Sequence, residues 1–164
     1  MIVIADTSPL NYLIRLGHPD VLREIYGRVL VPHPVLIEMQ HPEAPPEVRD
    51  WASTPPPWLE EVHVQQLDTS LAVELGPGER EAISLALEVR ADVLLIDERA
   101  GRQEAEARHI AVAGTLAVLL QASLRGYIDF PEATKQLRRY GFRASRPIEA
   151  VMLARYEQAK KGKL

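Results

Sequence analysis

The sequence predicts an α/β fold in which a parallel sheet is covered by helices on both faces. Short, continuously apolar runs such as Ile2–Ala5 and Val93–Ile96 have the length of strands. Stretches with helical length and capping residues separate these runs, so that strands and helices alternate along the chain. Strands that are apolar throughout are typical of parallel sheets, because helices cover both of their faces. At 164 residues the chain predicts a single domain over residues 1–164, with roughly two-thirds of its unfolded surface buried.

The first half of the chain begins with the strand at residues 2–5. Thr7 or Ser8 is expected to cap the next helix, with Pro9 at its first position and Gly17 at its end. The following elements are expected to be a short helix at 19–27, a strand at 28–32 and a helix that begins at Pro34. The proline-rich residues 41–58 predict a surface excursion with one short helix, and residues 62–65 predict a short edge strand.

The second half begins with the clearest helix, which enters from Gly76 and Pro77 and continues to residue 90. The remaining expected elements are a strand at 92–97, a polar helix at 98–109, a strand at 110–114, an apolar helix at 115–126, and helices at 131–140 and 147–161. The helix at 115–126 is apolar almost all round, which predicts that it is buried in the core or in a dimer contact.

Composition excludes several classes of protein. Hydrophobic residues make up 46% and charged residues 26% of the chain, which is ordinary for a globular protein. No apolar run approaches the ~20 residues of a membrane helix, and the N-terminus lacks a basic signal segment, so a cytoplasmic protein without membrane contact is expected. The absence of cysteine excludes disulfides, a thiolate nucleophile and a zinc–thiolate site.

The charge is distributed unevenly along the chain. Residues 1–124 contain 9 Lys and Arg against 19 Asp and Glu, whereas residues 125–164 contain 10 against 4. A basic helical segment at about 128–164 therefore follows an acidic body. Such a segment could bring positive charge to an acidic site and attract a polyanion, although a solvated C-terminal helix explains the same pattern.

Two aspartates occupy the position where α/β sheets bind ligands. Asp6 and Asp97 each directly follow a buried strand, and ligands of open α/β sheets bind beyond the carboxyl ends of the strands. A single aspartate there is more often a helix cap or an Asx turn. Two of them, on two strands expected at the centre of the sheet, favour a functional site.

Two glutamates are further candidates for this site. On a helical projection Glu79 lies on the same side as the apolar residues of its helix, whereas Glu81 and Ser84 fall on the opposite face, which is expected to be solvated. An acidic residue in a first helical turn is common, but that does not explain the inward direction of Glu79. Glu38 lies near the start of an earlier helix, and a solvated glutamate explains it equally well.

The four carboxylates together predict a metal site. Carboxylates about 5 Å apart repel by roughly 3 kcal/mol per pair at an effective dielectric constant of 20, so a cluster must take up protons or a cation. Oxygen-only ligands favour Mg²⁺ or Mn²⁺ over zinc, and a carboxylate-bound Mg²⁺ suits metal-assisted phosphodiester hydrolysis. The backbone N–H groups at Thr7 and Ser8 offer a site for a phosphate.

The chain resembles the PIN-domain ribonucleases, of the kind found as VapC-type toxins, and is closest to a poorly characterised branch of them. The resemblance rests on "IADTSPL", "LVPHPVLIE", "LGPGEREAISLALEV", "ADVLLIDERAGRQEA" and "IAVAGTLAVLLQASLRGYI". The order and spacing of Asp6, Glu38, Glu79 and Asp97, here called the acidic quartet, agree with the acidic residues of that family. The family commonly has aspartate where this chain has Glu79.

The resemblance implies a three-layer α/β/α sandwich, a Mg²⁺ or Mn²⁺ site held by the acidic quartet, and cleavage of single-stranded RNA by metal-activated water. It also implies a homodimer, a toxin role and a cognate antitoxin. Ser8 matches a small polar position that supports the first aspartate. Arg102 is a candidate phosphate ligand, although pairing with Glu98 or Glu106 also explains it, and Thr115 is expected to cap its helix or to contact phosphate.

Two other functions remain open. One is a non-catalytic PIN-like module that binds RNA or protein. The other is a Mg²⁺-dependent small-molecule phosphohydrolase with Asp6 as nucleophile, although Ser8 stands where such enzymes generally have a second aspartate. The five histidines show no H-E-x-x-H motif and no metal-ligand spacing, so they are interpreted as structural.

Overall fold

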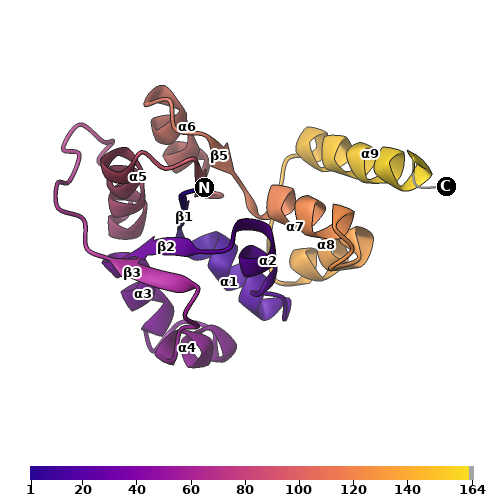
Figure 1. The fold of residues 1–164 in the computed structure, drawn as a ribbon, viewed down its shortest axis with the longest axis horizontal. Helices are drawn as coiled ribbons and strands as arrows, with labels where there is room; N and C mark the ends of the chain where they lie inside the picture. Colours follow the sequence, from indigo (N-terminus) through magenta and orange to yellow (C-terminus); the bar gives the residue numbers. More distant parts are fainter. Residues whose placement is uncertain (163–164) are drawn as a thin grey trace.

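A computed structural model describes residues 1–162 of the protein. Its centre is a five-stranded sheet in which all neighbouring strands run parallel, in the order β3-β2-β1-β4-β5 (Figure 1). The strands are β1 (Val3–Ala5), β2 (Val29–Pro32), β3 (Leu59–Val62), β4 (Val93–Leu95) and β5 (Val112–Ala113). The parallel sheet that the apolar runs predict is therefore confirmed.

The order of the strands creates a switch point beside β1. From β1 the chain adds β2 and then β3 on one side, and it returns to place β4 and β5 on the other side. Connections therefore leave β1 and β4 in opposite directions. In open parallel sheets, ligands usually bind at such a switch point, beyond the carboxyl ends of the strands.

Helices cover both faces of the sheet. Val3 and Ala5 of β1 pack in one apolar cluster with residues of α1, α2, α3, α4, α7 and α8, whereas Ile4 packs in a second cluster with residues of α5 and α6. The helices are α1 (Thr7–Arg15), α2 (Val21–Tyr26), α3 (His33–Gln40), α4 (Pro46–Ser53), α5 (Pro77–Val89), α6 (Arg99–Ala107), α7 (Thr115–Leu124), α8 (Phe130–Arg139) and α9 (Arg146–Gly162). This arrangement is the expected three-layer α/β/α sandwich.

Two helices begin earlier than the capping residues predict. Asp6 is the N-cap of α1, with extended backbone angles (φ −82°, ψ 174°), so Pro9 lies inside the first turn instead of starting the helix. Gly114 is likewise the N-cap of α7 (φ −99°, ψ −179°), and Thr115 is the first helical residue. In both cases a single extended residue separates the strand from the helix, and this residue is itself the N-cap. The hydroxyl residue after it therefore becomes the first residue of the helix.

The edge strand lies three residues before its expected position. β3 pairs with β2 from Val29–Leu59 to Pro32–Val62, so His63 and the residues after it lie beyond the strand. Leu59 and Trp58 are buried, and the Trp58 ring packs against that of Trp51 with centroids 5.9 Å apart. Burial of Trp58 and Leu59 fixes the register of β3. The alternation of polar and apolar residues over 62–65, which predicts a strand there, does not reveal this register.

The predicted exposure is wrong in two places. Ser84 was expected on the solvated face of α5, but only 2% of its surface is exposed, because the loop before α5 covers it and the Asp68 N–H donates to its Oγ at 2.9 Å. The proline-rich segment is more than a surface excursion, because Val48 and Ala52 of α4 are fully buried in the core.

The C-terminal helices extend one end of the molecule. α7 is buried on most sides, as its apolar sequence predicts, and α9 packs against it before projecting away from the sheet (Figure 1). The rings of Phe130 and Tyr156 join α8 to α9, with centroids 5.7 Å apart. Within residues 1–162, no helix combines the length and apolar composition that crossing a bilayer requires.

Candidate active site

Asp6 and Asp97 lie beyond the carboxyl ends of the two strands that flank the switch point. β1 and β4 pair in register from Val3–Val93 to Ala5–Leu95. The Asp6 N–H then donates to the Leu95 carbonyl at 2.9 Å, which extends the pairing to the first aspartate. The two carboxylates, 91 positions apart in sequence, therefore stand at one edge of adjacent strands.

Asp6 is the buried centre of the site. Only 4% of its surface is exposed. Burial, followed by the negative charges of Glu79, Glu38 and Asp97, raises the pKa of Asp6 from 3.8 to about 7, although a hydrogen bond from the Thr7 N–H acts in the opposite direction. Each of the other three quartet members thus acts electrostatically on Asp6.

Glu38 reaches this centre from α3. Its Oε2 accepts a hydrogen bond from Thr7 Oγ1 at 2.9 Å, which ties it to the residue next to Asp6. Gly78 lies between them: a Cβ at Gly78 would lie 3.3 Å from Glu38 Oε2 and 3.5 Å from Asp6 Oδ1. A glycine at the start of α5 therefore allows the helix to approach both carboxylates closely.

Glu79 is half-buried on the side of α5 that faces α6. The Gly76 N–H donates to its carboxylate, so Glu79 closes the N-terminus of its own helix in the manner of a capping box. Burial raises the pKa of Glu79, the charges of Glu98 and Glu38 raise it further, and the Gly76 hydrogen bond lowers it. A Cβ at Gly101 of α6 would lie 3.0 Å from Glu79 Oε2. Glu79 thus has a capping role as well as a place beside Asp6.

Asp97 is held rigidly by the start of α7. Its two carboxylate oxygens accept hydrogen bonds from the Thr115 N–H at 2.7 Å and from Thr115 Oγ1 at 2.6 Å. Burial raises the pKa of Asp97, whereas the Thr115 hydrogen bonds and the charge of Arg102 lower it. A Cβ at Gly114 would lie 2.9 Å from both Asp97 Oδ1 and Arg102 Nη1, so only glycine fits without displacing them.

The three expected supporting residues have different surroundings. Thr115 is fully buried and its hydroxyl is used by Asp97, which makes it a positioning residue. Arg102 extends toward Asp97 and Gly114. Ser8 is half-buried in the first turn of α1, and within residues 1–162 its side chain makes no hydrogen bond to Asp6.

Two further residues, which no apolar sequence pattern selects, belong to the site. The charge of Glu98 raises the pKa of both Glu79 and Asp97. Burial and the charge of Asp97 raise the pKa of Tyr12, whose ring packs edge-on against Phe142 at 5.2 Å. The position of Glu98 directly after Asp97 was an available signal, whereas nothing in the sequence links Tyr12 to a residue 85 positions later.

A groove of about 760 Å³ opens beside Asp97. Its walls are formed by α6, β5, the start of α7, the segment before α9, and α9 as far as Arg155. Arg99, Arg102, Arg143 and Arg155 line it together with apolar side chains that include Phe142 and Met152. The C-terminal basic segment thus contributes two arginines to a groove that contains a carboxylate of the acidic quartet.

The acidic quartet fits a hard divalent cation. Its donors are all carboxylates, and within the described chain none of Asp6, Glu38 and Glu79 forms an ion pair with Lys, Arg or His. Among the described residues, backbone and hydroxyl hydrogen bonds but no paired cationic side chains therefore oppose their mutual repulsion. No three of the quartet's oxygens gather within 4.8 Å in residues 1–162, an open arrangement that suits Mg²⁺, which keeps several waters and needs only one or two direct carboxylates.

Comparison with known proteins identifies the fold. A family model described as a PIN domain matches residues 2–158, which is almost the whole chain. Searches of curated proteins and of solved structures give no match. PIN domains have a nuclease-type fold, and the parallel sheet with carboxylates at its switch point agrees with that assignment. The chain therefore belongs to the PIN-domain family.

Proposed function

We propose that the protein is a Mg²⁺- or Mn²⁺-dependent endoribonuclease that cleaves single-stranded RNA at the acidic quartet. One observation carries the proposal: the buried carboxylate of Asp6, with its pKa raised to about 7, lies under the combined charge of Glu38, Glu79 and Asp97. Such a concentration of acids destabilises the folded protein, because the carboxylates repel one another. A bound divalent cation would offset this repulsion, which is the reason for inferring a metal site.

The residues of the quartet have separate tasks in this proposal. Asp6 and Asp97 hold the cation from two adjacent strands, and Glu38 and Glu79 complete its surroundings directly or through water. When bound, Mg²⁺ or Mn²⁺ polarises the phosphodiester and lowers the pKa of an attacking water. Thr7 orients Glu38, and Thr115 orients Asp97, through hydrogen bonds that leave each carboxylate in one position.

The groove beside Asp97 supports a nucleic-acid substrate. Its four arginines offer bidentate contacts to phosphates, and its apolar walls offer surfaces for unstacked bases. This combination favours a single strand over a duplex, because the bases of a duplex are not free to contact such walls. The choice of RNA over DNA comes from the family resemblance.

The partners implied by the resemblance belong to the same proposal. On α9, Val151 and Leu153 lie outside the groove and expose 49% and 42% of their surfaces, whereas Ile148, which is 45% exposed, lines the groove. We infer that a second copy of the chain covers exposed apolar residues of α9 outside the groove in a homodimer. A toxin role with a cognate antitoxin and a cytoplasmic location are also inferred, and they depend on the nuclease activity described above.

The test uses EDTA-treated protein, a labelled single-stranded RNA, and added Mg²⁺ or Mn²⁺. We expect internal cleavage that requires the metal and that falls by at least ~100-fold in Asp6→Asn and Asp97→Asn, since each removes a metal ligand. Asp50→Asn is the matched control for the aspartates, because Asp50 is exposed on α4. Glu79→Gln is compared with Glu81→Gln on the same helix.

Other results would assign a different function. Turnover of a small phosphate monoester without RNA cleavage would indicate the phosphohydrolase. RNA binding without cleavage under either metal would indicate the non-catalytic module. Cleavage that is unchanged in both Asp6→Asn and Asp97→Asn would exclude the acidic quartet as the active site.

A further inference from the structure

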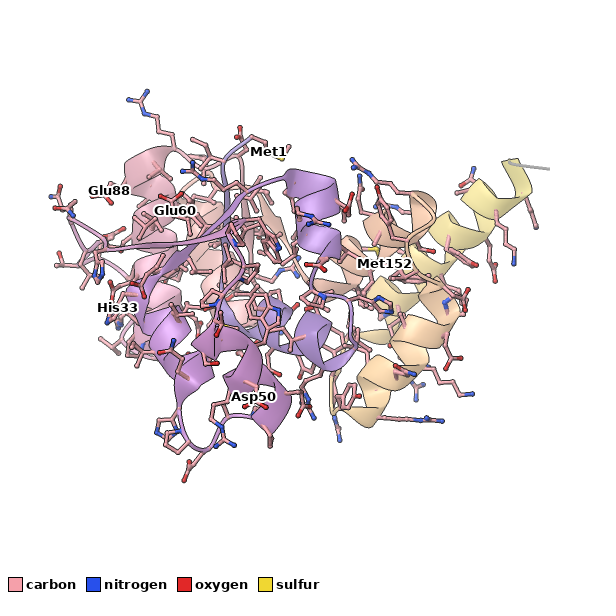
Figure 2. All side chains as sticks on the ribbon, turned by 60° about the horizontal axis from the view of Figure 1, so that its bottom comes forward. Met1, His33, Asp50, Glu60, Glu88 and Met152 are labelled. Atoms are coloured by element: carbon pink, nitrogen blue, oxygen red, sulfur yellow. The ribbon has the colours of Figure 1, made fainter. Side chains whose placement is uncertain are left out.

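We propose that His33, Glu61 and His63 form a second metal site, which binds a divalent transition ion of the Zn²⁺ class at the edge of the sheet. These residues belong to neither the acidic quartet nor the arginine-lined groove. In Figure 2 the labelled His33 and the groove residue Met152 lie on opposite sides of the view. The proposal does not depend on the nuclease function.

The ligand atoms already have nearly the spacing of a metal site. His33 Nδ1 lies 3.2 Å from Glu61 Oε2, and His63 Nε2 lies 3.6 Å from Glu61 Oε1. One ligand atom from each residue lies within 4.8 Å of both others. Ligands around a tetrahedral ion, with bonds of about 2.1 Å, are separated by roughly 3.4 Å. Small rotations of exposed side chains are sufficient to close the site.

The backbone explains why the three side chains meet. Val31 is opposite Glu61 and Pro32 is opposite Val62 in the parallel pair of β2 and β3, so His33 follows next to His63. Glu61 lies on β3 and His63 directly follows its last residue, Val62, so the two are two positions apart, the spacing at which side chains of extended backbone share a face. The two imidazole rings stack with centroids 4.7 Å apart and an interplanar angle of 26°. Strand pairing thus brings the ligands together before any ion binds.

The chemistry of this set differs from that of the acidic quartet. Two imidazoles and one carboxylate are borderline ligands that suit Zn²⁺ and its neighbours in the first transition row, whereas oxygen-only sets suit Mg²⁺. Three protein ligands leave a further position for water. An ion here would connect the end of the edge strand β3 to His33, the first residue of α3, and so stabilise the folded chain.

The test is a calorimetric titration of metal-free protein with Zn²⁺. Excess Mg²⁺ is present so that it occupies the acidic quartet. We expect one tight Zn²⁺ per chain and a rise in thermal stability. His33→Ala and His63→Ala should each weaken binding by roughly 100-fold or more, because even outer-shell partners of a metal contribute 10–100-fold. His18→Ala, an exposed histidine outside the cluster, is the control and should leave both readouts unchanged.

The two metal sites can be separated with further variants. Asp6→Asn and Asp97→Asn should abolish nuclease activity but retain the Zn²⁺ titration. If Zn²⁺ affinity falls in Asp97→Asn and is unchanged in His33→Ala and His63→Ala, the ion binds at the quartet and the proposal is wrong. Equally weak binding in the wild type and in both histidine variants would also overturn it. Circular dichroism of each variant confirms that the fold is intact.

Discussion

At the scale of single residues, Asp6 shows how function acts against stability. Its carboxylate is buried, lacks a cationic partner among the described residues, and lies near three other acids. Folding disfavours its ionised form, and a bound divalent cation would remove this penalty. The metal-free protein should therefore be less stable than the metal-bound protein, and the charge of Asp6 should account for much of the difference.

This leads to a prediction on pH. Because the pKa of Asp6 rises from 3.8 to about 7 on folding, the native state holds its proton more tightly than the unfolded state, and stability falls as pH rises through that interval. Asp6→Asn should raise the free energy of unfolding in EDTA by roughly 2–4 kcal/mol at pH 8 and by clearly less at pH 5. Urea denaturation at the two pH values measures this. An equal effect at both would show that the charge of Asp6 is not the cause.

The sequence predicts individual residues well only where a local pattern identifies them. Asp6 and Asp97 follow apolar strands directly, and Glu79 lies on the apolar side of its helix. Each could therefore be selected without coordinates. The pairing of His33 with His63 depends on the register of β2 and β3, which the burial of Leu59 determines. The spacing of the histidines along the chain gave no indication of it.

At the scale of elements, one network connects the loop before α5 to α6. Arg108 Nε donates to Asp68 Oδ2 at 2.7 Å, and Arg108 Nη2 donates to Ser70 Oγ at 2.8 Å. Asp68 also accepts from Ser70, and these hydrogen bonds lower the pKa of Asp68 to about 2. The loop they fix leads directly into the helix that carries Glu79.

Breaking this network should destabilise the fold. Asp68→Asn and Arg108→Gln should each lower the free energy of unfolding by about 1–2 kcal/mol at pH 7, and a double-mutant cycle should give a coupling of about 1 kcal/mol. Because the folded pKa of Asp68 is low, its contribution is present above pH 4 and is lost as pH falls toward 2. Additive effects of the two substitutions would contradict the coupling.

Most elements follow from sequence because their apolar periodicity and their proline and glycine positions agree. The failures occur where a distant segment decides the outcome. The helical projection places Ser84 on the face of α5 that is expected to be solvated, but the loop around Asp68 covers it. Trp58 and Leu59 place β3 through burial, although the alternation of polar and apolar residues suggests a later strand.

At the scale of the whole molecule, the acidic body and the basic C-terminal segment of the chain meet in one groove. The acidic body supplies Asp97, and the basic C-terminal segment supplies Arg143 and Arg155 to the same groove. The negative net charge of the protein, −4, therefore does not describe the surface next to the candidate active site. A polyanion would meet positive charge there.

The groove predicts a specific dependence on salt. In the double variant Arg143→Gln/Arg155→Gln we expect weaker binding of single-stranded RNA, a higher KM and an unchanged kcat, since neither residue belongs to the quartet. The slope of log affinity against log salt should decrease in magnitude by about 1.4, or 0.7 for each lost phosphate contact. The control is Lys135→Gln/Arg139→Gln on α8, which removes the same charge outside the groove. Equal losses in both variants would indicate a general charge effect.

The pairing of β1 with β4 has a consequence for synthesis on the ribosome. The first aspartate emerges early, but its neighbouring strand is made some ninety residues later, and the threonine that orients the second aspartate follows after that. A nascent or prematurely terminated chain that stops before β4 contains three of the four quartet carboxylates but lacks Asp97, so it cannot form the site. Any cleavage that requires both aspartates is therefore withheld until β4 and the start of α7 have been made.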